Sequence, residues 1–157
     1  MTDLFAELDR ERSALLDTIA GLDEATLDRK GLINEWSIKN VLAHLVGWEI
    51  WIIQALPALL ASGEMPEALR AAAADEDAWN AAQVAEREEL TPGEQLIELE
   101  RTRAALLEYL HTLDEATFTR PHPWPRWRGT LMEYLFFATR DHEARHRKEI
   151  QVAIDRL

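Results

Sequence analysis

Apolar residues recur every three or four positions along most of the chain, which is the period of amphipathic helices. One such stripe lies near the start of the chain, and a similar stripe recurs in its second half. Their apolar positions are Leu4, Leu8, Leu15, Ile19 and Leu22 in the first stripe, and Leu96, Leu99, Leu106, Leu110 and Leu113 in the second. The pattern predicts an all-α protein in which both stripes face a shared core.

The two stripes belong to an internal repeat at an offset of 91 residues. Residues 5–29 lie over residues 96–120 without a gap, and 13 of these 25 positions are identical. The shared positions include the run 22–26, which recurs as 113–117, and Arg12, which recurs as Arg103. Trp36 falls on Trp127 at the same offset. We interpret the repeat as a duplicated helical hairpin.

Each copy is predicted to hold a helix, a one-turn linker and a second helix. Hairpin one spans residues 3–61, a long crossover spans 62–90, and hairpin two spans 91–157. The second hairpin opens with Thr91 as the N-cap residue, Pro92 at the first helical position and Glu94 as capping-box partner. The second helices of the hairpins begin at Ser37 and Thr130. Four long helices with one or two extra turns in the crossover predict a single-domain four-helix bundle.

Three of the five histidines form a candidate metal site. His142 and His146 stand at i and i+4, so both rings project from one face of the last helix. His44 lies in an apolar segment of an earlier helix, where a buried imidazole needs a polar partner. Three imidazoles on one side of an ion leave other positions open, which is typical of catalytic zinc sites. A solvated, charge-rich helix end is the competing interpretation of residues 140–149, and spacing alone does not decide between them.

Residues 142–146 also fit the HExxH signature of zinc proteases, with Glu143 as general base. Such enzymes take their third ligand from downstream, and no histidine follows His146 in this sequence. A compact bundle also lacks the strand edge that an extended peptide substrate needs. We therefore expect this match to be coincidental.

Composition narrows the possible functions. The chain has no cysteine, which excludes disulfides, thiolate metal sites and a cysteine nucleophile, and fits a cytoplasmic location. A net charge of −12 argues against a nucleic-acid partner. Residues 41–61 are long and apolar enough to span a bilayer, but they include His44, Glu49 and Pro57. A buried bundle helix explains this segment better, so no membrane partner is expected.

Two segments resemble motifs of the DinB-like (DinB/YfiT) superfamily. Residues 35–45 (EWSIKNVLAHL), followed by Trp48 and Glu49, resemble the second-helix motif, and residues 141–147 resemble the histidine pair of the last helix. The resemblance covers essentially the whole chain, including the order of helices and the central connection. It implies an up-down-down-up bundle in which His44, His142 and His146 hold a divalent metal, most often zinc or nickel.

The same resemblance suggests two kinds of activity. Characterised relatives include transferases and isomerases that use a low-molecular-weight thiol, namely bacillithiol, mycothiol or glutathione. A neighbouring branch, the ClbS/DfsB-like proteins, is linked to self-protection against a genotoxin and need not use a metal. The start of the second helix at Trp36 and Ser37, and the pair Trp79 and Asn80, resemble that branch.

We expect a metal-dependent enzyme with a small-molecule substrate, most concretely a transferase that acts from a small thiol. Because the chain has no cysteine, the thiol must arrive as a cosubstrate. Glu49 and Glu143 are expected to support the metal ligands or to act as general base. The alternative is a metal-free protein that binds or neutralises a reactive small molecule.

Aromatic and basic residues complete the expected site. Trp48 and Trp51 are expected to wall an apolar pocket. Arg126 and Arg128, just before the last helix, are candidates to bind a carboxylate of the thiol, although solvated loop arginines would look the same in the sequence. Six tryptophans exceed what a small core usually needs, so a homodimer surface is a third possibility.

Overall fold

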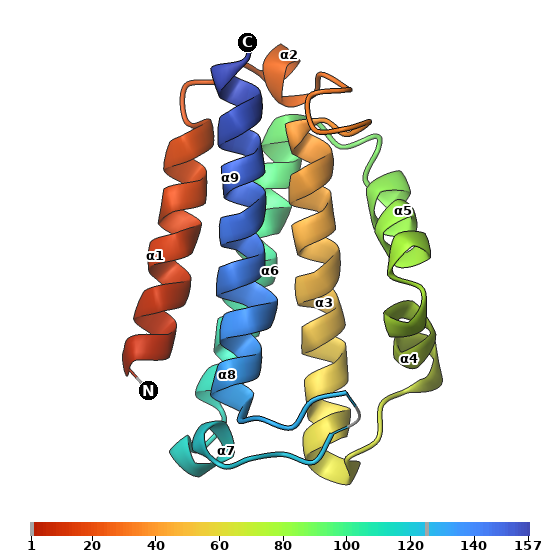
Figure 1. Ribbon diagram of the computed structural model, residues 1–157, viewed down its shortest axis with the longest axis vertical. Helices are drawn as coiled ribbons and strands as arrows, with labels where there is room; N and C mark the ends of the chain where they lie inside the picture. The colour runs from red at the N-terminus through yellow and green to blue at the C-terminus, as the bar shows by residue number, and fades with distance from the viewer. Residues whose placement is uncertain (1, 125) are drawn as a thin grey trace.

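A computed structural model describes residues 2–124 and 126–157, and these residues form an all-α helical bundle without strands. Long helical segments lie side by side in Figure 1. They are α1 (Thr2–Ile19), α3 (Ile38–Ser62), α6 (Pro92–His111) and a C-terminal segment made of α8 (Leu131–Leu135), η1 (Phe136–Asp141) and α9 (His142–Asp155). In Figure 1 the chain rises in α1, descends in α3 and in α6, and rises again through α8 and α9.

The one-turn linkers expected within each half are present as short helices. They are α2 (Glu24–Leu27) and α7 (Glu115–Thr119). The Asp23 carboxylate accepts a hydrogen bond from the backbone N–H of Thr26, and Asp114 does the same for Thr117, both at 2.8 Å. Each linker is therefore an N-capped turn whose chemistry is visible in the sequence.

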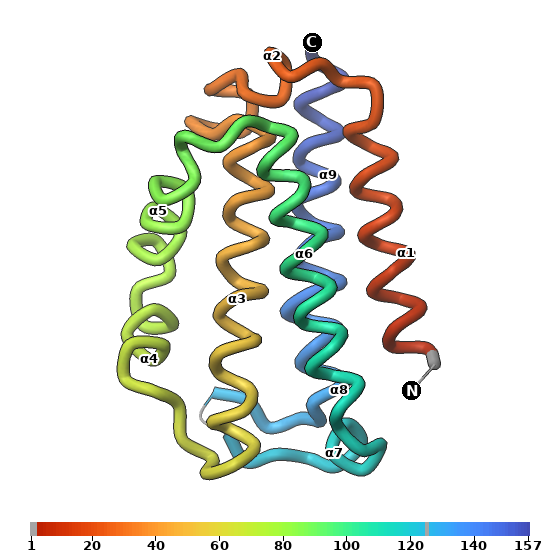
Figure 2. The backbone as a smooth tube through the Cα atoms, turned by 180° about the vertical axis from the view of Figure 1, so that it is seen from behind, coloured from red at the N-terminus to blue at the C-terminus, as the bar shows by residue number. Residues whose placement is uncertain are grey.

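The crossover contains more helix than the sequence analysis predicted. Instead of one or two turns, it holds α4 (Glu67–Ala74) and α5 (Glu76–Glu86), and both lie along the outer side of α3 in Figure 2. Alanine and glutamate, which are strong helix formers, dominate this segment. Asp75 begins α5 by accepting a hydrogen bond from the backbone N–H of Ala78 at 3.1 Å. The expectation of a short crossover helix was wrong because it neglected these propensities.

The predicted starts of the long helices are confirmed. Capping boxes join Ser37 to Asn40, Thr91 to Glu94, and Thr130 to Glu133. The last helix is not continuous, however, because η1 is a π-helix between α8 and α9. A π turn accommodates one extra residue and rotates every later side chain about the helix axis. This interruption ends at the residue before His142.

Most positions of both apolar stripes are buried, whereas Leu22, Leu96 and Leu113 are partly exposed, and α3 is the most buried of the long helices. Leu8, Leu15, Leu99 and Leu106 are fully inaccessible to solvent. By length and composition alone α3 could cross a membrane, but half of its most apolar window is buried inside the bundle. The core helix of a soluble bundle has the same properties, so the weak membrane signal in this helix does not identify a span.

Candidate metal centre

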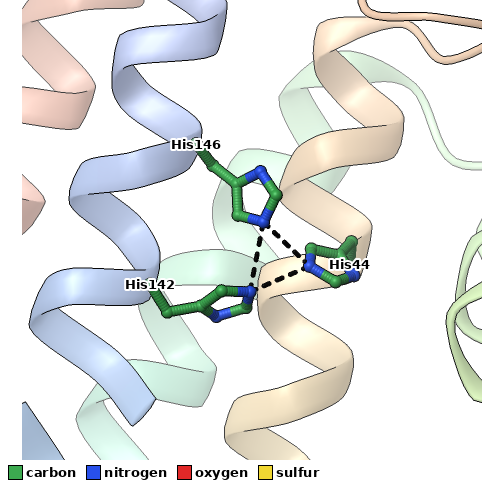
Figure 3. Close-up of side chains that lie close together, drawn as sticks. All are labelled: His44, His142 and His146. Carbon is green, nitrogen blue, oxygen red and sulfur yellow. Dashed lines mark hydrogen bonds between the residues drawn. The ribbon is translucent and has the colours of Figure 1, made fainter. Parts of the chain in front are cut away.

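Three histidines from two helices converge between α3 and α9 (Figure 3). The Nε2 atom of His44 lies 3.0 Å from the Nε2 atoms of both His142 and His146, and these two Nε2 atoms are 3.1 Å apart. His44 and His146 are 5% and 8% exposed, and His142 is half-buried. Because His146 and Glu143 are buried, the helix face that carries the histidines is not the solvated, charge-rich end that was the competing interpretation of residues 140–149.

The crossover helix α5 fixes the orientation of the His44 ring. Asn80 Oδ1 lies 2.7 Å from Trp48 Nε1 and 3.0 Å from His44 Nδ1. An indole N–H can only donate, so the amide atom facing Trp48 is the accepting oxygen. His44 Nδ1 must then carry the proton that it shares with Asn80. This leaves the lone pair of His44 Nε2 directed at the other two rings.

His146 is oriented in the same way by its own helix. Its Nδ1 lies 2.8 Å from Oε2 of Glu149, one turn further along α9. A carboxylate accepts the Nδ1 proton, which again directs the Nε2 lone pair toward the cluster. Histidine ligands of metals in proteins usually donate their second ring N–H to a carboxylate or a carbonyl oxygen in this manner.

Truncating Asn80 should weaken metal binding without removing a ligand. Asn80→Ala leaves the His44 Nδ1–H unpaired and its ring free to turn, so we expect zinc affinity to fall by roughly 10–100-fold. Asn80→Asp keeps the accepting oxygen and should retain most of the affinity. Competition of each variant with a chromophoric chelator measures both effects. Equal affinity for wild type and Asn80→Ala would show that this contact does not orient a metal ligand.

The chemistry of the cluster fits a divalent metal better than an unfilled polar contact. The Nε2 lone pairs of His44 and His146 face each other and repel, whereas a cation shared by the three Nε2 atoms would be attracted to all three nitrogens. Three nitrogens bound to one tetrahedral zinc at 2.0–2.1 Å lie about 3.3–3.4 Å from one another. The observed spacings of 3.0–3.1 Å are close to this arrangement. The cluster can therefore hold an ion with small rotations of the rings.

The histidine pKa values predict how the metal-free protein responds to acid. Burial, together with the neighbouring imidazoles, lowers the pKa of His44 to about 4 and that of His142 to about 3. Because these values lie below the unfolded pKa of about 6.5, the unfolded chain binds protons first as the pH falls. The stabilising effect is thus complete above pH 6.5 and is lost progressively toward pH 3.

We expect the urea midpoint of the metal-free protein to fall between pH 7 and pH 4, with a loss on the order of a few kcal/mol. His142→Ala should remove part of this slope, whereas His111→Ala, at an exposed position, should not. Denaturation curves at several pH values measure the slope for each protein. A wild-type slope equal to that of His142→Ala would contradict the assignment of the acid response to this cluster.

A buried network of two arginines and two glutamates joins α1, α3, α6 and α9. Arg12 donates to Glu143 at 2.6 Å and to Glu49 at 3.1 Å. Arg103 donates to Glu49 at 2.8 Å and to Glu143 at 2.6 Å. All four side chains are at most 7% exposed. The network therefore fixes α9, which carries two of the histidines, against the other three long helices.

This network defines where Glu49 and Glu143 lie. Their oxygens accept arginine N–H groups, and neither residue is among those that line the pocket beside the histidines. Such an arrangement is suited to positioning α3 and α9 rather than to taking a proton from a substrate. Glu143 thus occupies the HExxH position without the free carboxylate that a protease general base needs.

A pocket of about 680 Å³ opens beside His44 and His142. Trp48 and Trp51 line it, and further aromatic walls come from the C-terminal half. These additional aromatic residues are Trp127, Tyr134 and Phe137. Arg126 lines the pocket and donates to the carbonyl oxygen of Ala73 at 3.1 Å, whereas Arg128 is not among the lining residues. Apolar walls with a few convergent polar groups are typical of small-molecule sites.

Several site residues were not identified from the sequence. Asn80 was noted without a role, and Glu149 was treated as part of a charged helix end. Arg12 and Arg103 interrupt the two apolar stripes one turn after Leu8 and Leu99, which is a signal of a buried ion pair that could have been recognised.

The fold and the histidine cluster define a class: a helical-bundle protein with a buried three-histidine site that can hold a metal. The sequence profile of the DinB superfamily matches residues 7–150. The chain therefore belongs to the DinB superfamily, as the motifs around His44 and His142 indicated. No curated protein matches the chain in sequence.

Solved structures of similar fold share little sequence with this chain. An uncharacterised protein from Escherichia coli UTI89 is 15% identical with a TM-score of 0.79, covering 99% of this chain and 92% of that one. The sibling lethal factor precursor DfsB is 14% identical with a TM-score of 0.79, covering 99% and 95%. A protein from Streptococcus pneumoniae is 14% identical with a TM-score of 0.75, covering 94% and 86%. At these identities the likeness concerns the fold alone.

Proposed function

We propose that this protein is a metal-dependent enzyme, most concretely a transferase that uses a small thiol. The observation that carries the proposal is the convergence of the Nε2 atoms of His44, His142 and His146 at 3.0–3.1 Å beside a pocket of small-molecule size. A divalent ion, zinc or nickel in the first instance, would lower the pKa of a thiol and so supply a nucleophile at neutral pH.

The chain's own residues would bind and orient the reactants. Asn80 accepts a hydrogen bond from His44 Nδ1, and Glu149 accepts one from His146 Nδ1. The buried network of arginines and glutamates fixes α9 against α3. The aromatic walls around Trp48 and Trp51 would bind the apolar part of a substrate and exclude water. Because the chain has no cysteine, the reacting sulfur must belong to the cosubstrate.

The thiol proposal is tested with glutathione, bacillithiol and mycothiol, using monobromobimane as the electrophile. Transfer forms a carbon–sulfur bond, expels bromide and releases the thiol proton to the buffer, and the fluorescent thioether reports the rate. We expect zinc-loaded protein to accelerate the reaction of one thiol and His142→Ala to abolish the gain. Calorimetry measures binding of each thiol directly. Absence of both binding and acceleration for all three thiols would exclude this function.

A metal-free binding or self-resistance protein is the second candidate. The aromatic pocket supports it, because Trp48, Trp51 and Trp127 offer a surface for a flat or apolar molecule without help from a metal. The structure of DfsB has a similar fold, so the ClbS/DfsB-like branch named in the sequence analysis uses the same kind of bundle. This candidate predicts that His44 and His142 are dispensable for ligand binding, whereas the enzyme proposal predicts that function is lost with them.

We further infer that the up-down-down-up bundle arose by duplication of one hairpin. Arg12 and Arg103, 91 residues apart, bind the same pair of glutamates. The capping-box residues Asn40 and Glu133 are 93 residues apart, whereas Glu49 and Glu143 are 94 apart, and the π turn in η1 accounts for the added residue.

A cytoplasmic location and a homodimer remain proposals, which fractionation and sedimentation test.

A further inference from the structure

The charges around the pocket differ from those of the chain as a whole. The net charge of the protein is −12, yet two arginines, Arg126 and Arg145, line the pocket beside the histidines. Two acidic residues, Glu76 and Asp141, line it as well, and Asp141 binds Arg140 at 2.8 Å. Any metal held by the three neutral imidazoles would add further positive charge. The charges of the lining residues thus balance on a strongly acidic protein, and a bound metal would make the pocket locally positive.

Arg145 is the arginine placed to act on a bound molecule. It lies between the ligands His142 and His146 on α9, and its neighbours Arg140 and Arg147 pair with Asp141 and Glu11. Within residues 2–124 and 126–157, Arg145 forms no ion pair of its own.

The charge of Arg145 reaches the histidine cluster. Arg145 follows His142 by three residues on α9, so both side chains project from the same side of the helix, and both line the pocket. A positive charge beside three neutral ligands is unfavourable for a metal site taken alone. It is favourable when an anion is bound next to the cluster, since the anion offsets both charges.

Arg126 has a different role. Its guanidinium donates to the Ala73 carbonyl oxygen at the end of α4, and its backbone adopts a left-handed conformation with a φ of 68°. These features attach the loop before α8 to the crossover helices. Arg126 is thus suited to holding one wall of the pocket, and Arg145 remains free to bind a ligand.

We propose that the pocket takes an anionic small molecule whose apolar or aromatic body lies between the tryptophans and whose acidic group is bound by Arg145. The inference rests on the proposed function for its location, because it describes the substrate of the same site. It adds a substrate class, an acid with an apolar body, and it names a specificity-determining residue that is not a metal ligand. A guanidinium presents a planar fork that suits carboxylate, sulfonate and phosphate groups.

The test uses metal-free protein, so that its result does not depend on metal binding. The probes are 8-anilino-1-naphthalenesulfonate and N-phenyl-1-naphthylamine, which share an aromatic body and differ in the sulfonate. Fluorescence titrations with wild type, Arg145→Gln and Arg145→Lys give the affinities. We expect Arg145→Gln to bind the sulfonate about tenfold more weakly and the neutral probe unchanged, and Arg145→Lys to recover part of the loss.

Arg128→Gln is the matched control, because Arg128 is a nearby arginine outside the pocket lining, and it should change neither affinity. Unchanged sulfonate binding in Arg145→Gln would overturn the proposal, as would an equal loss for both probes. A selective loss in a protein that never binds metal would retain the anion site and reject the metal-dependent function. If the protein bound zinc but Arg145→Gln showed no selective loss of sulfonate binding, the metal site would be retained and the anion site rejected.

Discussion

Replacing His44 with alanine is expected to abolish specific metal binding. His44 is the one cluster member on α3, and its Nε2 atom is 3.0 Å from both partners on α9. Without it, His142 and His146 remain as an i, i+4 pair on one helix. This pair offers two ligands, and α3 then contributes no ligand to the metal. The loss should therefore exceed the roughly 10–100-fold expected for removing an outer hydrogen-bond partner. Zinc titration against a chromophoric chelator measures it.

His111→Ala serves as the control for His44→Ala. His111 is exposed at the end of α6 and stacks on Phe5 with ring centroids 4.1 Å apart. It is not a member of the three-histidine cluster. Its substitution should leave zinc affinity unchanged. If His44→Ala bound zinc as tightly as His111→Ala, the metal would have to reside elsewhere, and the three-histidine site would be rejected.

Arg103→Met is expected to destabilise the protein by about 3–5 kcal/mol, the range for breaking one side of a buried ion-pair network. Arg103 donates to both Glu49 and Glu143, and each carboxylate is less than 7% exposed. Removing the guanidinium leaves two buried negative charges that share Arg12 alone. Methionine fills much of the volume, so the loss reports the charge rather than a cavity. Chemical denaturation measures the free energy of unfolding.

Arg101→Met provides the matched comparison on the same helix, because Arg101 is exposed. Surface changes of this kind usually alter stability by less than about 0.5 kcal/mol. Replacing all four network residues with apolar or amide side chains should cost much less than Arg103→Met, since no charge is then left unpaired. An effect of Arg103→Met no larger than that of Arg101→Met would show that the carboxylates find other partners.

Local signals in the sequence predicted much of the fold. The N-caps at Ser37, Thr91 and Thr130 depend on hydrogen bonds to residues three positions away, so they can be read from a short window. The π turn in η1 has no comparable local signature. It depends on the register that α9 needs to bring Glu143 toward Arg12 and Arg103, which is a property of the packed bundle.

The site was predictable to a similar degree. The pairing of His142 with His146 follows from helical spacing, whereas the approach of His44 depends on how α3 and α9 pack. The contact between His44 and Asn80 joins residues 36 positions apart on different helices, so no periodicity reveals it. The family resemblance supplied the link among the three histidines that spacing alone left open. Arg145 was hidden because an exposed arginine on a charged helix carries no distinguishing pattern.

Elemental analysis of protein purified without chelator tests the central claim most directly. Wild type and His142→Ala are prepared in parallel, and zinc, nickel, copper, iron and manganese are measured for each. The account predicts about one divalent ion per chain in wild type, as for a single three-histidine site, and a large loss in His142→Ala. Wild-type protein that contains no metal and gains none on dialysis against zinc would contradict it.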